Sequence, residues 1–407
     1  MDVTVAIDHR FRQTPDGKFW SMTSFAYSFW ERYLSVFDGV RILARTQPVD
    51  KPAANWSRAD GPGVHFTPVP YYHGPLQYLQ RYPLVKKTIK QAVNESEAII
   101  LRIQGQIGSC ARPYLRQTGH PYGVEVVGDP YDAFAPGYVT HPLRPFLQWW
   151  LPRRMREQCA RAAAAAYVTE FALQQRYPPA PGAFTTHYSS IVLQDEAFAA
   201  QPKQAALNQK RFNLITIGTL DNLSKGADTM LETLVICVGN GLDLTWTQVG
   251  GGTYQPMLEQ RAAELNIADR VHFCGWVTAG SGVWAELDKA DLFILPSRQE
   301  GLSRATIEAM ARGLPCIATT VGGSAELLPG RWLVAPNNPV GLARKIGSMV
   351  ADPRQMQQEA ARNLAQARNY SQRVLRQRWT ALYQHLRDET AVWLAANGHS
   401  ANKLKVA

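Results

Sequence analysis

The segment of residues 291–326, DLFILPSRQEGLSRATIEAMARGLPCIATTVGGSAE, constrains the fold more than any other part of the chain. Its first apolar run, residues 292–295, ends at a proline and is typical of a strand buried on both faces of a parallel sheet. Ser303 is a favourable N-cap for a helix over residues 304–312, and a Gly-x-Pro stop signal follows. A second apolar run, residues 316–320, completes a strand–helix–strand unit.

Two carboxylates occupy special positions in this unit. Glu300 lies on the loop after the first strand, where open α/β sheets bind their ligands. Glu308 lies about one and a half turns into the helix. Between them, the backbone N–H groups of residues 302–304 point out of the helix N-terminus and are free to bind a phosphate. The acids are placed to accept from sugar and ribose hydroxyls. The alternative is that Glu300 interacts with the helix dipole and Glu308 lies on a solvated face.

The surrounding residues extend the pattern to P-S-x-x-E-G, then E-A-M-A-x-G-x-P, then V-G-G-x-x-E. This pattern resembles the nucleotide-sugar site of the family 4 retaining glycosyltransferases. The resemblance implies an α/β protein of the GT-B fold, with two Rossmann-like domains facing across a cleft and a C-terminal helix crossing back to the N-terminal domain. It also implies that Glu300 positions the donor sugar and Glu308 the ribose. Where the family has Gly-Phe-Gly after the first acid, this chain has Gly301, Leu302 and Ser303.

Length and charge agree with a two-domain protein that binds anions. With 407 residues, the chain is too long for one ordinary core. The net charge is +10 without a long basic tail or stripe, so we expect no nucleic-acid partner. A diffuse positive field suits nucleotide diphosphates or acidic lipid head groups.

Cysteine usage and hydropathy indicate a cytoplasmic protein. The five cysteines are scattered without a C-x-x-C, which is typical of a reducing compartment. The N-terminus lacks the pattern of a secretion signal, and no run of 18 apolar residues would span a membrane. Peripheral contact with the inner membrane is compatible with this prediction.

Residues 1–200 predict a Rossmann-like domain, because apolar runs alternate with helical or irregular segments. By the resemblance, this domain binds the acceptor. The expected strands are residues 3–7, 40–44, 64–69, 99–103, 124–127 and 164–168. Two loops carry candidates. Gly17, in the expected polar loop of residues 8–18, would let backbone approach a phosphate, unless it forms a plain turn. Asp129 would orient acceptor or sugar, unless it forms an Asp-Pro turn. Gly128 stands where many family members have histidine.

Residues 145–166 raise the question of membrane contact. Trp149 and Trp150 beside three arginines suit docking on an anionic membrane surface. The alternative is an amphipathic helix packed on the domain with its arginines in solvent. We favour this alternative, because Pro152 is expected to interrupt the helix.

Residues 177–210 have the composition of a linker, and residues 208–370 predict a second Rossmann-like domain that, by the resemblance, binds the donor. Its first strand runs into Gly218 and Thr219, and the family has an arginine where Thr219 stands. Lys225 lies on the next loop, where its ammonium would neutralise a diphosphate.

The resemblance places the base against backbone near Val277, where Trp276 either stacks on the base or packs against the protein. Residues 371–390 predict the helix that crosses back to the N-terminal domain, and residues 391–407 a frayed basic tail.

The chemistry is expected to need no metal and no cofactor, because the sequence holds no Asp-x-Asp and no Cys/His cluster with zinc spacing. Protein groups would then meet the charge on the leaving diphosphate. The catalytic candidates are Glu300, Lys225 and Asp129. The donor-binding candidates are Gly17, Gly218, Thr219, Lys225, Val277, Glu300, Gly301, Leu302, Ser303, Arg304 and Glu308.

The leading hypothesis is metal-independent, retaining transfer of a sugar from a nucleotide-diphosphate sugar to a glycan or lipid-linked acceptor. The alternative is a non-catalytic nucleotide-sugar-binding protein of a polysaccharide assembly complex. This alternative is motivated by the departures from the family pattern at Thr219, Gly128 and Leu302–Ser303. A GT-B epimerase is a third hypothesis.

Overall fold

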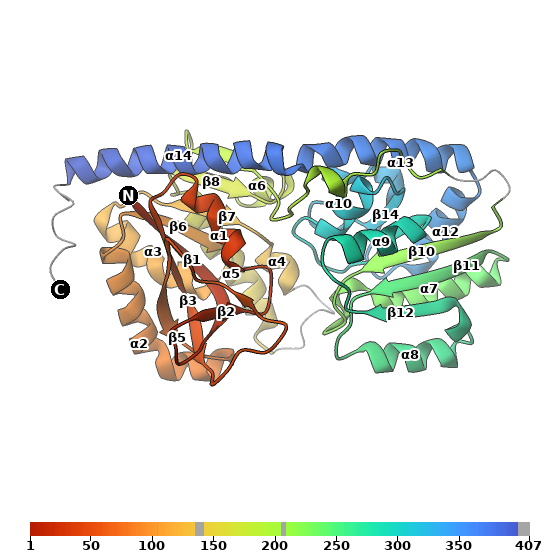
Figure 1. The fold of residues 1–407 in the computed structure, drawn as a ribbon, viewed down its shortest axis with the longest axis horizontal. Coiled ribbons are helices and arrows are strands. Elements are labelled where there is room, and N and C mark those ends of the chain that lie inside the picture. Colours follow the sequence, from red (N-terminus) through yellow and green to blue (C-terminus); the bar gives the residue numbers. More distant parts are fainter. Residues whose placement is uncertain (104, 135–141, 205–208, 398–407) are drawn as a thin grey trace.

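The computed structural model describes residues 1–103, 105–134, 142–204 and 209–397. Two α/β domains lie side by side, and a helical segment near the C-terminus runs along the top of both (Figure 1). The predicted GT-B architecture is confirmed, with one sheet of mainly parallel strands in each domain.

The N-terminal sheet has a parallel part in the order β5-β3-β1-β6-β7-β8-β9. Strands β6, β7 and β8 are buried along their whole length, including the charged residues Arg102 of β6 and Glu125 of β7. The short β2 and β4 add to the end of β1 in antiparallel pairs. The strands are β1 (Asp2–Gln13), β2 (Phe19–Ser21), β3 (Gly39–Pro48), β4 (Ser57–Arg58), β5 (Val64–Pro70), β6 (Ala98–Ile103), β7 (Gly123–Val126), β8 (Ala164–Tyr167) and β9 (Phe184–His187).

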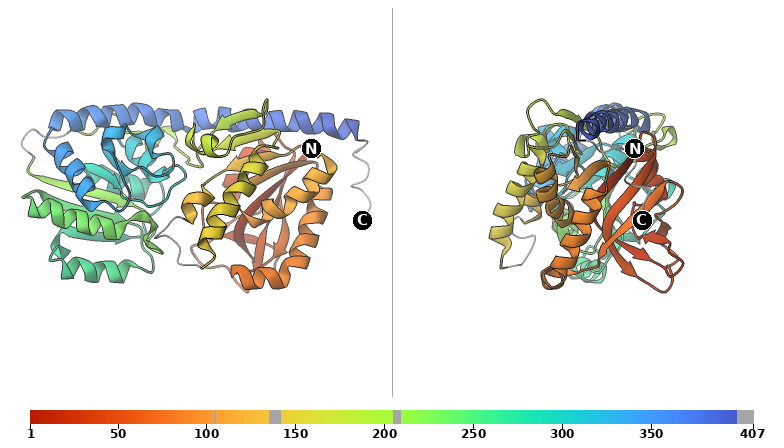
Figure 2. Two further views of the ribbon diagram at one scale, coloured as in Figure 1. Left: turned by 180° about the vertical axis from the view of Figure 1, so that it is seen from behind. Right: turned by 90° about the vertical axis from the view of Figure 1, so that its left-hand side faces the viewer.

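Helices cover both faces of this sheet (Figure 2). On one face, α2 (Gly74–Asn94), α3 (Gln106–Thr118) and α5 (Arg144–Cys159) bury their apolar sides in one cluster. On the other face lie α1 (Tyr27–Leu34) and α14 (Gln372–Ala396), which comes from the far end of the chain. The short helices α4 (Pro130–Ala133) and α6 (Ala172–Arg176) follow β7 and β8.

The C-terminal sheet is entirely parallel, in the order β12-β11-β10-β13-β14-β15. Its strands are β10 (Arg211–Ile217), β11 (Asp243–Val249), β12 (Val271–Gly275), β13 (Leu292–Leu295), β14 (Cys316–Thr319) and β15 (Leu333–Val334). Its helices are α7 (Ala227–Gly239), α8 (Gln255–Glu264), α9 (Ser281–Lys289), α10 (Arg304–Ala311), α11 (Ser324–Leu327), α12 (Pro339–Val350) and α13 (Pro353–Ala367). Helices α7, α8 and α12 pack on one face, and α9 and α10 on the other.

Helix α14 connects the two halves. It follows α13 after a single 3-10 turn (Arg368–Tyr370) and packs on β8, β9 and α1, so it crosses back to the N-terminal domain as predicted. The hydrophobic cluster that contains it also includes β13, β14 and α10 of the C-terminal sheet. The helix continues to Ala396, past the predicted start of the tail at residue 391. Residues 398–407 lie outside the described residues.

Several local predictions were wrong. Residues 8–13 form the second part of β1 instead of a loop, because residues 10–13 pair with residues 45–48 of β3. The expected linker contains β9, which pairs with β8. Pro152 lies inside α5 without ending the helix.

Candidate functional site

The predicted site residues of the C-terminal domain gather at the carboxyl edge of its sheet. The loops after β10 and β13 meet there with the turn before α7. Gly218 makes this possible, since a Cβ at this position would lie 2.8 Å from Cγ of Lys225. The lysine stem therefore passes directly over the backbone at the end of β10.

Lys225 and Glu300 form the centre of the site. The ammonium of Lys225 contacts Oε1 of Glu300 at 2.6 Å, and the hydroxyl of Ser297 donates to the same oxygen at 2.8 Å. Among the described residues, none donates to Oε2 of Glu300. One carboxylate oxygen is thus fixed from two sides, which leaves the other to accept from a ligand hydroxyl.

The N-terminus of α10 follows Glu300 and carries free donors. The hydroxyl of Ser303 caps the helix by accepting from Thr306 N at 3.2 Å. Leu302 is buried and anchors the loop in the core. Within the described part of the chain, the backbone N–H groups of Ser303 and Arg304 have no protein acceptor. The departure Leu302–Ser303 therefore preserves a helix start that can bind an anion.

Glu308 lies on the same helix and is half-buried. Burial raises the pKa of its carboxyl, and Arg304 one turn earlier lowers it in part. No described residue donates a hydrogen bond to this carboxyl. A half-buried carboxyl beside a phosphate-binding helix start is suited to accept hydroxyl groups of a ligand.

Arg298 supports the site, a role that the sequence analysis missed. Its guanidinium binds Asp228 of α7 through two contacts of 2.8 Å and also donates to the carbonyl of Leu223. Its backbone N–H donates to Ser224 O at 2.7 Å. The loop before Glu300 therefore holds the Leu223–Lys225 turn in place. An arginine two residues before a predicted site acid was the available signal.

The rest of the carboxyl edge consists of polar backbone and one exposed aromatic ring. The hydroxyl of Thr219 donates to Asp221 at 2.9 Å, so it serves its own loop. Trp276 is 71% exposed, and its indole lies over the backbone of Gly251. The packing role considered for Trp276 does not fit this exposure. Val277, next to it, is partly buried against the core.

The two domains touch at this edge. A Cβ on Gly301 would lie 2.7 Å from the carbonyl of Val127, so only glycine lets the Glu300 loop approach the end of β7 this closely. Nearby, the carboxylate of Glu326 accepts from the backbone N–H groups of residues 170–172 of the N-terminal domain at 2.6–3.0 Å.

Asp129 and Gly17 are not brought into the centre. The buried carboxylate of Asp129 caps α4 through Tyr131 N at 2.8 Å and also binds Arg176 and the hydroxyl of Tyr177. This arrangement fits the turn-forming alternative. Gly17 lies in the hairpin turn between β1 and β2, where its N–H donates to Thr14 O, as expected for a plain turn.

No metal-binding group of three or more His, Cys, Asp or Glu residues occurs in the part of the chain that the structure describes. Within the same ranges, none of the helices combines the length and the apolar character needed to cross a bilayer.

Comparisons agree with this geometry. Residues 211–352 match the family model of the glycosyl transferases group 1. Protein CapJ of Staphylococcus aureus is 24% identical over 350 residues, covering 85% of this chain and 86% of CapJ. Sucrose-phosphate synthase of Thermosynechococcus elongatus superposes with a TM-score of 0.63 at 17% identity, over 98% of this chain and 100% of that chain. HepE of Anabaena, in complex with UDP, gives 0.60 at 16% identity, over 97% and 100%.

Two facing α/β domains with this edge define a glycosyltransferase of the GT-B fold. Over residues 211–352, the chain is similar to the glycosyl transferases group 1. The narrower assignment to family 4 stays a prediction.

Proposed function

We propose that the protein transfers a sugar, with retention and without a metal, from a nucleotide-diphosphate sugar to a glycan or lipid-linked acceptor. One observation carries the proposal: Lys225, Glu300 and the free N–H groups of α10 converge at the edge where the two domains meet. Positive charge and N–H donors thus lie beside a carboxylate with one oxygen free.

The diphosphate is assigned to Lys225 and the α10 N-terminus. As the bond to the sugar breaks, negative charge grows on the phosphate oxygens, and preorganised donors stabilise it without reorganisation. Lys225 is already held at Glu300, so it needs little ordering when the donor binds. Arg304 is exposed at the first position of α10 and adds a second cation.

The sugar is assigned to Glu300 and the nucleoside to Glu308 and Trp276. Oε2 of Glu300 accepts from a sugar hydroxyl, and the carboxylate of Glu308 accepts from the ribose. Trp276 offers an exposed ring on which a base can stack. HepE was solved with UDP, which makes uracil the first base to test.

A lipid-linked acceptor is supported by the helix layer of the N-terminal domain. Phe146 and Trp149 on α5 are more than half exposed, and so are Leu76 and Leu79 on α2. All four lie in the first half of their helices, and each helix starts near the carboxyl edge of the sheet, which faces the C-terminal domain. Arg153 stacks on Trp149 at 4.0 Å, which places a cation beside the apolar group.

The test is a thermal-shift screen against UDP-, GDP-, ADP- and dTDP-sugars, with and without magnesium. We expect one nucleotide to raise Tm by about 5 °C at a hundredfold excess over Kd, independently of magnesium. Lys225→Ala and Glu308→Ala should both abolish this shift. If no donor shifts Tm, the site assignment is wrong.

Turnover separates the enzyme from a binding protein. Incubation with the donor and membrane or glycan extracts should release free nucleoside diphosphate only when acceptor is present. NMR of the product should show the anomeric configuration of the donor. Donor loss without acceptor would indicate the epimerase instead, and an inverted product would contradict retention.

A further inference from the structure

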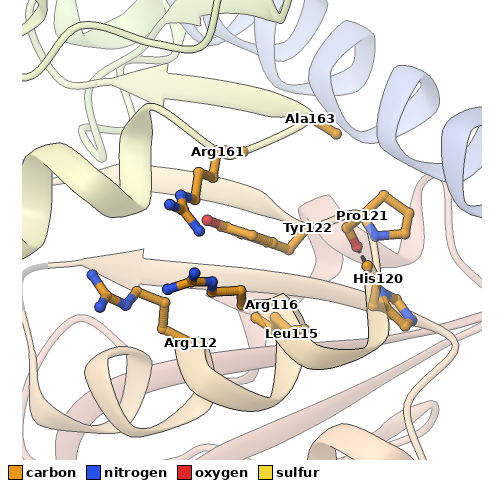
Figure 3. A pocket seen from close by; sticks show the side chains of 10 residues that line it. Arg112, Leu115, Arg116, His120, Pro121, Tyr122, Arg161 and Ala163 are labelled. Carbon is orange, nitrogen blue, oxygen red and sulfur yellow. Dashed lines mark hydrogen bonds between the residues drawn. The ribbon is translucent and has the colours of Figure 1, made fainter.

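A pocket lies at the end of the N-terminal sheet that faces away from the C-terminal domain. Its volume is about 310 Å³, and it opens where α3 ends and where β7 and β8 begin (Figure 3). The strands of this part of the sheet are parallel, so their amino ends face away from the cleft, where their carboxyl ends lie. None of the proposed donor-site residues lines it.

Three arginines line this pocket. Arg112 and Arg116 lie one turn apart on α3, and Arg161 follows α5. Figure 3 shows Arg161 on one side of the Tyr122 ring, with Arg112 and Arg116 on the other. Glu157 pairs with Arg112. In the described ranges of the chain, Arg116 and Arg161 have no acidic partner within ion-pair distance.

This grouping is unfavourable for the protein alone. Burial lowers the pKa of Arg112, and the neighbouring Arg154, Arg161 and Arg116 lower it further, so the fold holds like charges close together. Exposed like charges normally separate, because their repulsion is not offset by packing. A hollow between guanidinium groups with one carboxylate nearby is therefore suited to an anion.

We propose that this pocket binds a phosphate-bearing anion between Arg116 and Arg161, with Arg112 held in place by Glu157. Guanidinium groups donate two parallel hydrogen bonds to phosphate oxygens, a geometry that lysine does not offer. A volume of about 310 Å³ lies at the lower end of the range for small-ligand sites, which suits a phosphate ester. The phosphate belongs either to a soluble ester or to a lipid head group.

The test compares two double variants of the full chain. R116Q/R161Q removes the two charges that lack an acidic partner. R373Q/R376Q is the matched control, because it removes two exposed arginines from α14 without touching the pocket. Inorganic phosphate and glycerol 3-phosphate are titrated by calorimetry, and flotation compares phosphatidylglycerol with phosphatidylcholine vesicles. Every titration is repeated with Lys225→Ala, which disables the proposed donor site.

A soluble source predicts saturable binding of the phosphates that weakens at least about tenfold in R116Q/R161Q, is unchanged in the control and persists in Lys225→Ala. A lipid source predicts the same pattern for flotation with phosphatidylglycerol. Glycosyl transfer to a soluble acceptor should be unchanged in R116Q/R161Q.

The proposal is overturned if neither probe binds saturably. It is also overturned if both double variants lose binding equally, since that would be an effect of overall charge. Binding that disappears in Lys225→Ala belongs to the cleft and likewise contradicts a separate pocket. Because the pocket and the cleft share no residue, failure here leaves the proposed function standing.

Discussion

Glu308 is a carboxyl group whose ionisation is opposed by burial. Its pKa is raised, so the group holds its proton to a higher pH in the folded protein than in the unfolded chain. Its contribution to stability is therefore largest at low pH and is lost as pH rises through the raised pKa. A ribose hydroxyl is accepted most strongly by the opposite, ionised state.

The first prediction concerns Glu308→Gln. We expect donor affinity in the wild type to rise with pH above the ordinary value of 4.5, as the carboxyl ionises. The variant should bind about tenfold or more weakly at pH 7, and its affinity should not change with pH. Donor titrations between pH 5 and pH 8 measure both. A variant with the wild-type pH profile would remove Glu308 from the ribose site.

Asp129→Asn tests whether this residue acts in catalysis or in folding. Its carboxylate satisfies Arg176, Tyr177 and Tyr131 N. Loss of its charge should reduce the free energy of unfolding by about 1–3 kcal/mol, because a buried hydrogen-bond network is disturbed. In the folded variant, kcat/KM should change by less than about threefold. Urea denaturation and initial rates decide the matter.

Asp132→Asn is the control for Asp129→Asn, because Asp132 contacts Arg176 at 3.1 Å from a more exposed position. This substitution should therefore reduce the free energy of unfolding by less. A loss of activity above a hundredfold in stable Asp129→Asn would restore the catalytic assignment.

The sequence could predict the centre of the site because its members are set by local order. Glu300, Ser303 and Glu308 lie on one strand–loop–helix segment, so their relative positions follow from its periodicity. The surroundings of Asp129 depend on Arg176 and Tyr177, which follow β8. No local pattern shows which side chains a folded chain will bring against a buried carboxylate.

At the scale of elements, Glu326 of α11 joins the two domains. Its carboxylate accepts three backbone N–H groups at the start of α6, the arrangement that a helix N-terminus favours for an anion. Glu326→Gln should cost about 1 kcal/mol in unfolding free energy and speed amide exchange in residues 170–173.

Exchange in β13 should stay the same in Glu326→Gln, and so should donor affinity, because the change leaves α10 intact. Equal acceleration in both segments would show general destabilisation instead of a weakened contact between the domains.

Long apolar runs predicted their elements well, and short polar ones did not. Strands β6, β8 and β13 are buried on both faces, so their sequence carries the signal. By contrast, β9 (FTTH) is stabilised by pairing with β8 and by Phe184, which stacks on His385 of α14 at 5.1 Å. Whether these residues form a strand depends on a helix much later in the chain, and the local sequence pattern carries no information about that contact.

At the scale of the whole molecule, one buried carboxylate ties the C-terminal helix to the N-terminal sheet. Glu125 of β7 accepts hydrogen bonds from Tyr33, Tyr188 and Tyr383 at 2.8–2.9 Å. Arg102 pairs with it, and Arg32 lies at 3.4 Å. Tyr383 belongs to α14, so this cluster joins segments from both ends of the chain.

The pKa of Glu125 gives the last prediction. Burial alone would raise this pKa, but the two guanidinium groups and the tyrosine hydrogen bonds lower it from 4.5 to about 2. A lowered folded-state pKa stabilises the protein at pH values above 4.5, and this contribution is lost as pH falls towards 2. The shift corresponds to about 3 kcal/mol at neutral pH.

Glu125→Gln should therefore lower the free energy of unfolding by about 3 kcal/mol at pH 7, and the difference from the wild type should shrink as pH falls from 4.5. Urea denaturation at pH 7, 5, 4 and 3, followed by tryptophan fluorescence, measures this convergence. Glu95→Gln, an exposed carboxyl paired with Arg41 at 3.6 Å, should show no such trend. Curves for Glu125→Gln and the wild type that stay parallel down to pH 3 would mean that the cluster holds α14 by packing and not by the charge of Glu125.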